Sequence, residues 1–132
     1  MPSAGGEEDA TVFRTLYPIL ATRDLEPMLR FYRDLMGAAV EYEFRDASGE
    51  LTYVGLRLGS ADLGIALDST AVREAEGRIS LWAYVDSCDR AVATLREAGV
   101  TIVDDPTDQP WGERMATVRD PDGNLVRVAQ TA

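Results

Sequence analysis

Histidine is absent from the sequence. Without an imidazole group, a Ser-His-Asp triad, a Cys-His pair and metal sites built on histidine are all excluded. A site made of carboxylates alone would suit Mg²⁺ or Ca²⁺, but no dense spacing of Asp and Glu marks one. We therefore predict no metal, no cofactor and no catalytic residue of these classes.

Cysteine occurs once, as Cys88, which excludes an intrachain disulfide and fits the reducing cytoplasm. Cys88 falls in the first turn of a predicted helix, where a thiolate is favoured, but no histidine is present to act as its base. We interpret it as a small helix residue. No apolar run approaches the ~20 residues of a membrane span, and residues 1–10 lack the basic and apolar regions of a signal peptide.

Basic residues are scarce: 13 Lys and Arg stand against 23 Asp and Glu, which gives a net charge of −10. Such a chain repels phosphate, so nucleic acids and anionic membranes are not expected partners. Two interpretations remain for the acidic charge, a cationic partner or simply a solvated acidic surface.

The segment 110–130 is typical of a β-hairpin. Two β-type runs, 115–119 and 125–130, flank the sequence Asp-Pro-Asp-Gly-Asn at 120–124. Pro121 fixes φ for a turn, while Gly123 and Asn124 tolerate the positive φ of a tight connection. A loop that contains Trp111 and Gly112 leads into this hairpin.

The chain repeats one unit at an offset of 62 residues, which aligns Asp24 with Asp86 and Gly37 with Gly99. Each aspartate is expected to cap a helix and each glycine to end it. The first pass predicts a strand at 16–22, a helix at 24–36 and strands at 39–45, 51–58 and 63–67. The second predicts a strand at 79–85, a helix from Asp86 to the glycine stop and strands at 100–103, 115–119 and 125–130.

This pattern predicts an α+β fold of two tandem βαβββ modules. Their strands are expected to form a curved mixed sheet with an open trough, and their helices to cover the outer face. A chain of 132 residues suits one domain. We predict a disordered tail at 1–13 and a single domain at 14–132, with modules at 14–67 and 78–132 joined by a linker at 68–77.

Aromatic side chains mark the predicted trough. In the strand at 79–85 the odd positions are apolar, so Trp82 and Tyr84 should point away from the helix. Aromatic rings bind flat or cationic ligands by stacking and cation–π contact, worth ~0.5–2 kcal/mol each. A ligand pocket and a homodimer interface explain these residues equally well, and a pocket between subunits satisfies both.

Other candidates for ligand contact are spread along the chain. Trp111 is expected to act as a lid or contact residue rather than a structural one, and Arg114 to anchor an acidic group or to form a surface ion pair. Either Glu41 or Glu43 would pair with a cation, since alternation leaves open which of them faces the trough. The predicted ligand-binding residues are Tyr17, Phe44, Tyr53, Trp82, Tyr84, Trp111, Arg114, Met115 and Arg127.

The repeated unit resembles the vicinal oxygen chelate superfamily, which includes glyoxalase I, extradiol dioxygenases, and the fosfomycin and bleomycin resistance proteins. The resemblance covers residues 16–130. It rests on Arg-Asp-Leu at 23–25, Phe-Tyr-Arg-Asp-Leu-Met-Gly at 31–37, Val-Asp at 85–86 and Arg-Asp-Pro-Asp-Gly-Asn at 119–124. The Pro-Trp-Gly sequence at 110–112, ahead of that hairpin, is most similar to the bleomycin-resistance branch.

The resemblance implies four inward metal-ligand positions, which map to Tyr17, Ile65, Ser80 and Arg127. These four side chains are not a plausible ligand set, since arginine carries a fixed positive charge. The branch that lacks the metal sequesters a drug without altering it, as a dimer that exchanges an N-terminal strand. We therefore expect a non-catalytic, antibiotic-binding homodimer. The alternatives are a metal-independent lyase or isomerase with a carboxylate base, and a regulatory module with a self-filled trough.

Overall fold

The fold is a tandem pair of βαβββ modules, as the repeat predicts. We describe a computed structural model in which residues 12, 15–71 and 79–131 are defined. The predicted tail at 1–13 and linker at 68–77 lie largely outside these residues. The first module comprises β1 (Ile19–Thr22), α1 (Leu25–Leu29), η1 (Arg30–Leu35), β2 (Ala39–Arg45), β3 (Leu51–Leu58) and β4 (Ala61–Leu67). The second comprises β5 (Ser80–Tyr84), α2 (Cys88–Glu97), β6 (Thr101–Asp108), β7 (Arg114–Arg119) and β8 (Leu125–Gln130).

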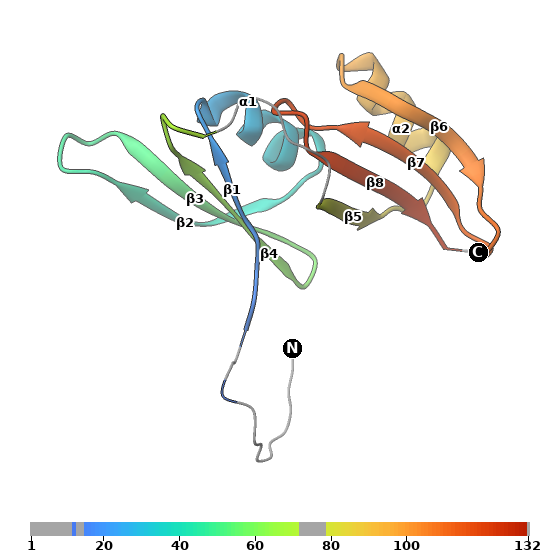
Figure 1. The fold of residues 1–132 in the computed structure, drawn as a ribbon, viewed down its shortest axis with the longest axis horizontal. Coiled ribbons are helices and arrows are strands. Elements are labelled where there is room, and N and C mark those ends of the chain that lie inside the picture. Colours follow the sequence, from blue (N-terminus) through green and yellow to red (C-terminus); the bar gives the residue numbers. More distant parts are fainter. Residues whose placement is uncertain (1–11, 13–14, 72–78, 132) are drawn as a thin grey trace.

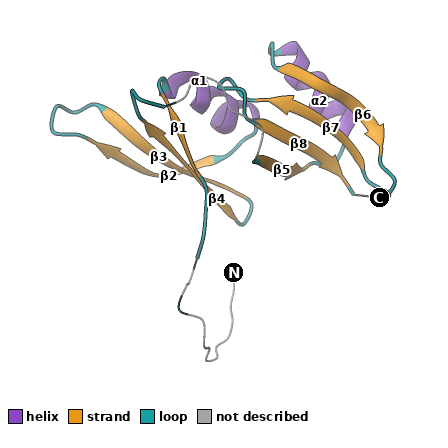
Figure 2. Cartoon of the chain, in the orientation of Figure 1, coloured by secondary structure: helices purple, strands orange, loops and turns teal. Residues whose placement is uncertain are grey.

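Each module has its own four-stranded mixed sheet, in the orders β1-β4-β3-β2 and β5-β8-β7-β6. The first strand of each module pairs in parallel with the last, and the remaining pairs are antiparallel. The modules lie side by side along the long axis of the molecule (Figure 1), and both helices lie along the same side of the sheets (Figure 2). The strands form two four-stranded mixed sheets, in keeping with the predicted α+β fold of two modules, and one face of each sheet is left without a helix.

The hydrophobic core lies between the helices and the sheets and continues from one module to the other. Met28, Ile65 and Val118 are fully buried in a single cluster that includes residues of both modules. Cys88 is buried there as well, and its Sγ donates to the backbone oxygen of Val128 at 3.3 Å. Burial raises the pKa of the Cys88 thiol, which is consistent with a structural role for this residue.

A π-helical turn explains where the sequence repeat fails. The helical part of the first module runs for 11 residues, Leu25 to Leu35, while α2 has 10 residues. The backbone nitrogen of Met36 donates to the oxygen of Phe31, five residues earlier, so the extra residue is absorbed as a π turn. The helix starts Leu25 and Cys88 are therefore 63 residues apart, whereas the glycines that end the helices are 62 apart.

A separate one-residue shift, between β3 and β4, reverses a prediction, because side chains alternate between the two faces of a strand. The buried Val54 of β3 matches the buried Ala116 of β7 at an offset of 62, whereas its partner Ile65 matches Val128, the partner of Ala116, at an offset of 63. At the offset of 62, Ile65 aligns with Arg127. Ile65 is nevertheless fully buried under the helices, opposite Val54, whereas Arg127 pairs with Trp82 on the face that no helix covers. The residue of β4 that faces the same way as Arg127 is Gly64, the partner of Ile19. The assignment of Ile65 to an inward metal position is therefore wrong.

Several element boundaries also differ from those predicted. The cap of α2 is Ser87 rather than Asp86, and its side chain accepts from the backbone nitrogen of Arg90. Asp24 is the N-cap of α1, but its side chain makes no capping hydrogen bond within the described residues. Strand β1 begins at Ile19 rather than residue 16, and β6 continues to Asp108 through residues predicted as a loop.

Asp120 joins the two modules at the predicted hairpin turn. Its Oδ1 accepts from the backbone nitrogens of Asp122 and Asn124, and its Oδ2 accepts from the Asn124 side chain. Oδ2 also accepts from the hydroxyl of Tyr32, in η1, at 2.6 Å. Burial, followed by the adjacent Asp120, raises the pKa of Tyr32, so the phenol remains protonated and donates to the carboxylate. Gly123 adopts φ +90° in this turn, as predicted.

Asp122, in the same turn, has a partly buried carboxyl group whose ionised form is unfavourable in the folded state. Its Oδ2 is buried and finds no hydrogen-bond partner among the described residues. Burial raises the pKa of Asp122, the carboxylates of Asp120 and Asp24 add to the shift, and the Thr22 hydroxyl opposes it. Folding therefore makes protonation of Asp122 easier, and the ionised carboxylate at neutral pH lowers the stability of the folded state.

We expect Asp122→Asn to stabilise the protein at pH 7, by roughly 0.5 kcal/mol because the side chain is only partly buried. The gain should shrink as pH falls through the raised pKa of Asp122, and vanish below the ordinary carboxyl value of 3.8. Asp46→Asn is the control and should destabilise the protein at pH 7. The hydrogen bond from the Ser48 side chain, and then bonds from backbone nitrogens, lower the pKa of Asp46. Thermal unfolding of both variants between pH 3 and pH 8 makes the comparison. A D122N variant that is less stable than the parent at pH 7 would contradict it.

Candidate functional site

The uncovered face of the first sheet carries a cluster of aromatic and acidic side chains, which we call the tyrosine patch. Its members come from β1 and the residues before it, β2, β3 and β4. They are Tyr17, Ile19, Glu41, Tyr42, Phe44, Tyr53 and Asp62. Most of them line a pocket of about 350 Å³. Their exposed aromatic surface is considerable, since Tyr17, Tyr42 and Phe44 are 44 %, 56 % and 51 % exposed.

Strand alternation and one bulge put these side chains on the same face. Tyr42 lies opposite Gly55, and Phe44 opposite Tyr53, in the β2–β3 pair. The register shifts between Val40 and Tyr42, and this β-bulge leaves Glu41 on the same side as Tyr42. Glu43, which lies opposite the buried Val54, is on the helix-covered face. Of the two carboxylates that the sequence left open, Glu41 is the one in the patch.

Gly64 makes room for the ring of Tyr53. A Cβ atom at Gly64 would lie 2.3 Å from the Tyr53 hydroxyl oxygen, so only glycine leaves the ring its place. The rings of Tyr42 and Tyr53 meet at an angle of 59° with centroids 6.1 Å apart. Partial burial, and then the nearby Tyr17 hydroxyl, raise the pKa of Tyr53, so this phenol is neutral at physiological pH.

The uncovered face of the second sheet carries a different cluster, which we call the tryptophan patch. It consists of Trp82, Tyr84, Trp111, Glu113, Met115 and Arg127. Trp82 pairs with Arg127 across β5 and β8. Tyr84 and Met115 lie on either side of Ala129, with which both pair. Trp82, Tyr84 and Trp111 are about half exposed.

Glu113 ties the tryptophan loop to strand β5. Its Oε1 accepts from the indole nitrogen of Trp111, and its Oε2 from the Tyr84 hydroxyl, both at 2.9 Å. The hydrogen bond to Glu113 raises the pKa of Tyr84, so the donor is retained at physiological pH. Glu113 was not predicted, because a single carboxylate beside a loop tryptophan carries no distinctive sequence pattern.

Arg127 is oriented by a neighbour within the sheet. Its Nη1 donates to the Thr117 hydroxyl at 2.8 Å, and Thr117 is buried beneath it. The guanidinium is thereby held next to Trp82 on the uncovered face. This places a fixed positive charge beside the aromatic rings of the patch.

Arg114 does not join either patch. It lies on the helix-covered side, where it donates to Asp89 of α2 and to Asp108 of β6 at 3.0–3.2 Å. These contacts match the surface ion pair that the sequence left as the alternative. The other eight predicted ligand-binding residues lie on the uncovered faces, divided between the two patches.

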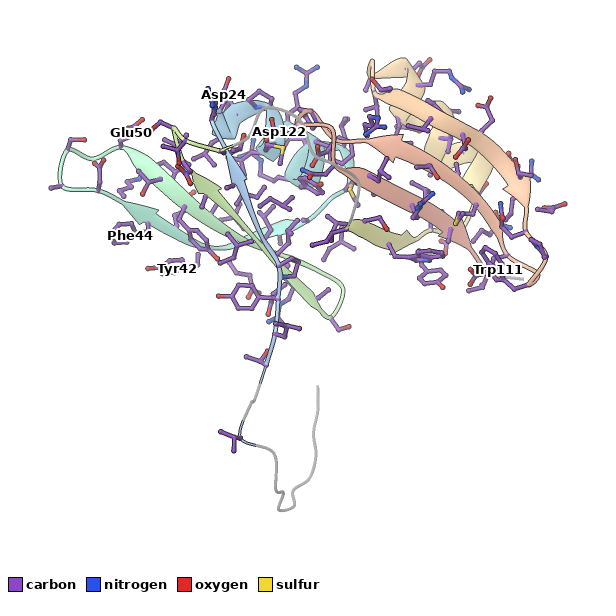
Figure 3. All side chains as sticks on the ribbon, in the orientation of Figure 1. Asp24, Tyr42, Phe44, Glu50, Trp111 and Asp122 are labelled. Carbon is purple, nitrogen blue, oxygen red and sulfur yellow. The ribbon has the colours of Figure 1, made fainter. Side chains whose placement is uncertain are left out.

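The two patches do not meet within one chain. Tyr42 and Phe44 lie under the first sheet, whereas Trp111 is at the far end of the second (Figure 3). The pocket of the tyrosine patch is lined by residues of the first module alone. A ligand that contacts both patches would therefore need them brought together.

The chemistry of the four inward positions does not fit a metal ion. Gly64, which takes the inward position on β4 in place of Ile65, has no side-chain donor, while Arg127 is a cation already bound to Thr117. Within the described ranges, no group of three Cys, Asp or Glu side chains is placed to hold an ion. No helix of the described chain is both long and apolar enough to cross a membrane.

The comparisons with known proteins agree with this fold. The chain is 26 % identical over 117 residues to Virulence protein STM3117 of Salmonella typhimurium, covering 85 % of this chain and 80 % of that protein. The crystal structure of a member of the glyoxalase/bleomycin resistance protein/dioxygenase superfamily from Sphaerobacter thermophilus aligns with a TM-score of 0.72 at 24 % identity. The alignment covers 91 % of this chain and 99 % of the other. TioX from Micromonospora sp. ML1 aligns with a TM-score of 0.68 at 23 % identity, over 90 % and 97 %.

A family model also matches residues 14–128, which is nearly the whole of both modules. The chain belongs to the Glyoxalase/Bleomycin resistance protein/Dioxygenase superfamily.

Proposed function

We propose that this protein binds and sequesters a small organic molecule with a flat ring system or a positive charge, of the antibiotic type, without altering it chemically. The observation that carries the proposal is the exposure of aromatic rings on both uncovered faces. Trp82 and Tyr84 are 47 % and 57 % exposed on a strand whose other side is packed. Monomeric proteins rarely leave such patches unoccupied, so they mark a binding surface.

A homodimer would bring the two patches together. The tyrosine patch of one copy would face the tryptophan patch of the other, and the trough would lie between subunits. The N-terminal segment supports exchange of a strand, because Leu16, just ahead of the residues that contact the first sheet, is 96 % exposed. The acidic charge argues against nucleic acids and membranes as partners, and the free thiol of Cys88 suits the cytoplasm.

A non-catalytic role suits the residues of the two faces. The inward positions do not make a plausible set of metal ligands, and catalysis without a metal is favoured by a carboxylate base whose pKa is raised. Among the described residues the carboxyl group with a raised pKa is Asp122, which lies in the β7–β8 turn rather than in a patch. Asp122 is therefore not placed to act as the base of a metal-independent lyase or isomerase in either patch, and no second function is favoured.

Tryptophan fluorescence tests the proposal directly, because both tryptophans lie in the tryptophan patch. We expect bleomycin or 9-aminoacridine to quench the emission saturably, with one ligand per trough and the ligand recovered unchanged by chromatography. Anthracene-2-carboxylate, which is flat but anionic, shows whether stacking alone is sufficient for binding or a positive charge on the ligand is also needed. Sedimentation should show a dimer. Absence of quenching by all three compounds in the folded protein, or chemical conversion of a bound one, would overturn the proposal.

A further inference from the structure

The tyrosine patch has the composition of a site for an organic ammonium group. We infer that Tyr17, Tyr42 and Tyr53, with the carboxylates of Glu41 and Asp62, bind the alkylated ammonium group of the ligand. This inference rests on the proposed function, and it assigns the positive charge of the ligand to one patch and the ring system to the other. Three observations lead to it.

The first observation is the shape of the pocket. The rings of Tyr42 and Tyr53 meet at an angle of 59°, and Tyr17 also lines the pocket. The volume of about 350 Å³ lies within the ~300–1,000 Å³ typical of small-molecule sites. Aromatic faces that meet at an angle contact a rounded cation from several sides, which is how methylated ammonium groups are recognised.

The second observation is that the backbone is shaped around the Tyr53 ring. A Cβ atom at Gly64 would lie 2.3 Å from the Tyr53 hydroxyl oxygen and 3.0 Å from Cγ1 of Ile19. At Gly55, on the neighbouring strand, the nearest atom to an added Cβ is Cβ of Tyr42 at 3.4 Å, which is an ordinary contact. The two glycines thus offer a matched pair of substitutions that differ in whether they displace the ring.

The third observation concerns charge. Glu41 and Asp62 both approach the guanidinium of Arg57, with Nε–oxygen distances of 3.4 Å and 3.0 Å. Two carboxylates and one arginine leave a net negative charge at the pocket wall. In the tryptophan patch, Glu113 and Arg127 cancel. A cationic group is therefore favoured in the tyrosine patch, and the overall charge of −10 steers cations toward the protein.

The test compares choline with its uncharged isostere 3,3-dimethylbutan-1-ol, which has the same shape without the charge. Binding is followed by NMR chemical shifts of the full chain. We expect choline to bind about tenfold more tightly than the alcohol, as expected for contact of a cation with several rings. Gly64→Ala should abolish this preference by displacing Tyr53, whereas Gly55→Ala should retain it.

The charge variants separate recognition from folding. Glu41→Gln and Asp62→Asn should each weaken choline binding and leave binding of the alcohol unchanged. Arg57→Gln should strengthen choline binding, because it removes the competing cation. Glu43→Gln is the matched control: it removes the same charge from the same strand on the helix-covered face, and should have no effect.

The outcomes distinguish this inference from the proposed function. Equal affinities for choline and the alcohol, or weaker choline binding in the R57Q variant, would overturn the inference, even if flat aromatic compounds still quench the tryptophans. Preferential choline binding that depends on Glu41, without quenching by any aromatic compound, would overturn the proposed function instead and leave the ammonium site standing.

Discussion

Replacing Asp120 with alanine is expected to lower the free energy of unfolding by about 3–5 kcal/mol, the largest loss we predict for a single side chain. The carboxylate is 4 % exposed and accepts four hydrogen bonds, from two backbone nitrogens, the Asn124 side chain and the Tyr32 hydroxyl. Bonds to a charged acceptor contribute about 1.5–3 kcal/mol each, although they do not add in full. The variant also leaves the Tyr32 hydroxyl, on a side chain only 2 % exposed, without its acceptor.

A second hairpin in the same chain provides the control. Asp46 makes the same turn between β2 and β3: its Oδ1 accepts from the backbone nitrogens of Ser48 and Glu50, and Gly49 adopts φ +89°. Asp46 is exposed to solvent, and the hydrogen-bond partners of its side chain belong to its own turn. Asp46→Ala should therefore destabilise the protein far less than Asp120→Ala, although the two turns have the same local geometry.

Urea unfolding followed by circular dichroism measures both losses. Tyr32→Phe measures how much of the loss in Asp120→Ala comes from the contact between modules, because it removes the hydrogen bond to Asp120 and leaves the turn intact. We expect it to cost less than Asp120→Ala and to leave the β7–β8 hairpin formed. Equal destabilisation by the D120A and D46A variants would show that the turn alone, and not the contact between modules, accounts for the role of Asp120.

The sequence was sufficient for the strands that turn residues delimit. Strands β2, β3 and β8 begin and end where predicted, since glycine-containing turns and the Asp-Pro-Asp-Gly-Asn segment mark their ends. Strand β6 was predicted too short because Asp104, Asp105 and Pro106 resemble a loop. It is an edge strand, and its register shifts between Asp104 and Thr107, which is where a sheet tolerates proline.

The site was predicted from the alternation of side chains between the two faces of each strand, so any unrecognised one-residue shift puts a residue on the wrong face. Trp82 and Tyr84 were placed correctly because the apolar positions of β5 fix its inner face. The faces of Ile65 and Glu41 depend on a one-residue shift between β3 and β4 and on a β-bulge, which the sequence pattern does not reveal. Arg114 begins a strand directly after a loop, so its face could not be predicted from periodicity.

The separation of the patches could not be predicted from one chain either. Alternation predicts which side chains share a face, but not whether two sheets of one chain face each other or a second copy. The exposed rings of both patches favour a second copy, which would supply the missing half of the trough. Binding of an aromatic ligand should then depend on dimer formation, and the patch residues should have their largest effect on affinity.

Replacing Trp82 with alanine is therefore expected to weaken binding of 9-aminoacridine about 10–100-fold, since stacking on one aromatic side chain is worth ~1–3 kcal/mol. Trp82 lies at the middle of β5 beside Arg127, so its ring is supported by the sheet on one side and is free on the other. Stability should change little, because the side chain is 47 % exposed and contributes little to the core.

Isothermal titration calorimetry measures this loss without relying on the tryptophan that is removed. Ile79→Ala is the control, since Ile79 is 77 % exposed just before β5 and lies outside both patches. Trp111→Phe makes Trp82 the sole emitter, so quenching in that variant reports contact with Trp82 itself. If the W82A variant binds 9-aminoacridine as tightly as the parent, then the ring of Trp82 does not stack on the ligand, and the uncovered face of β5 serves the dimer interface instead.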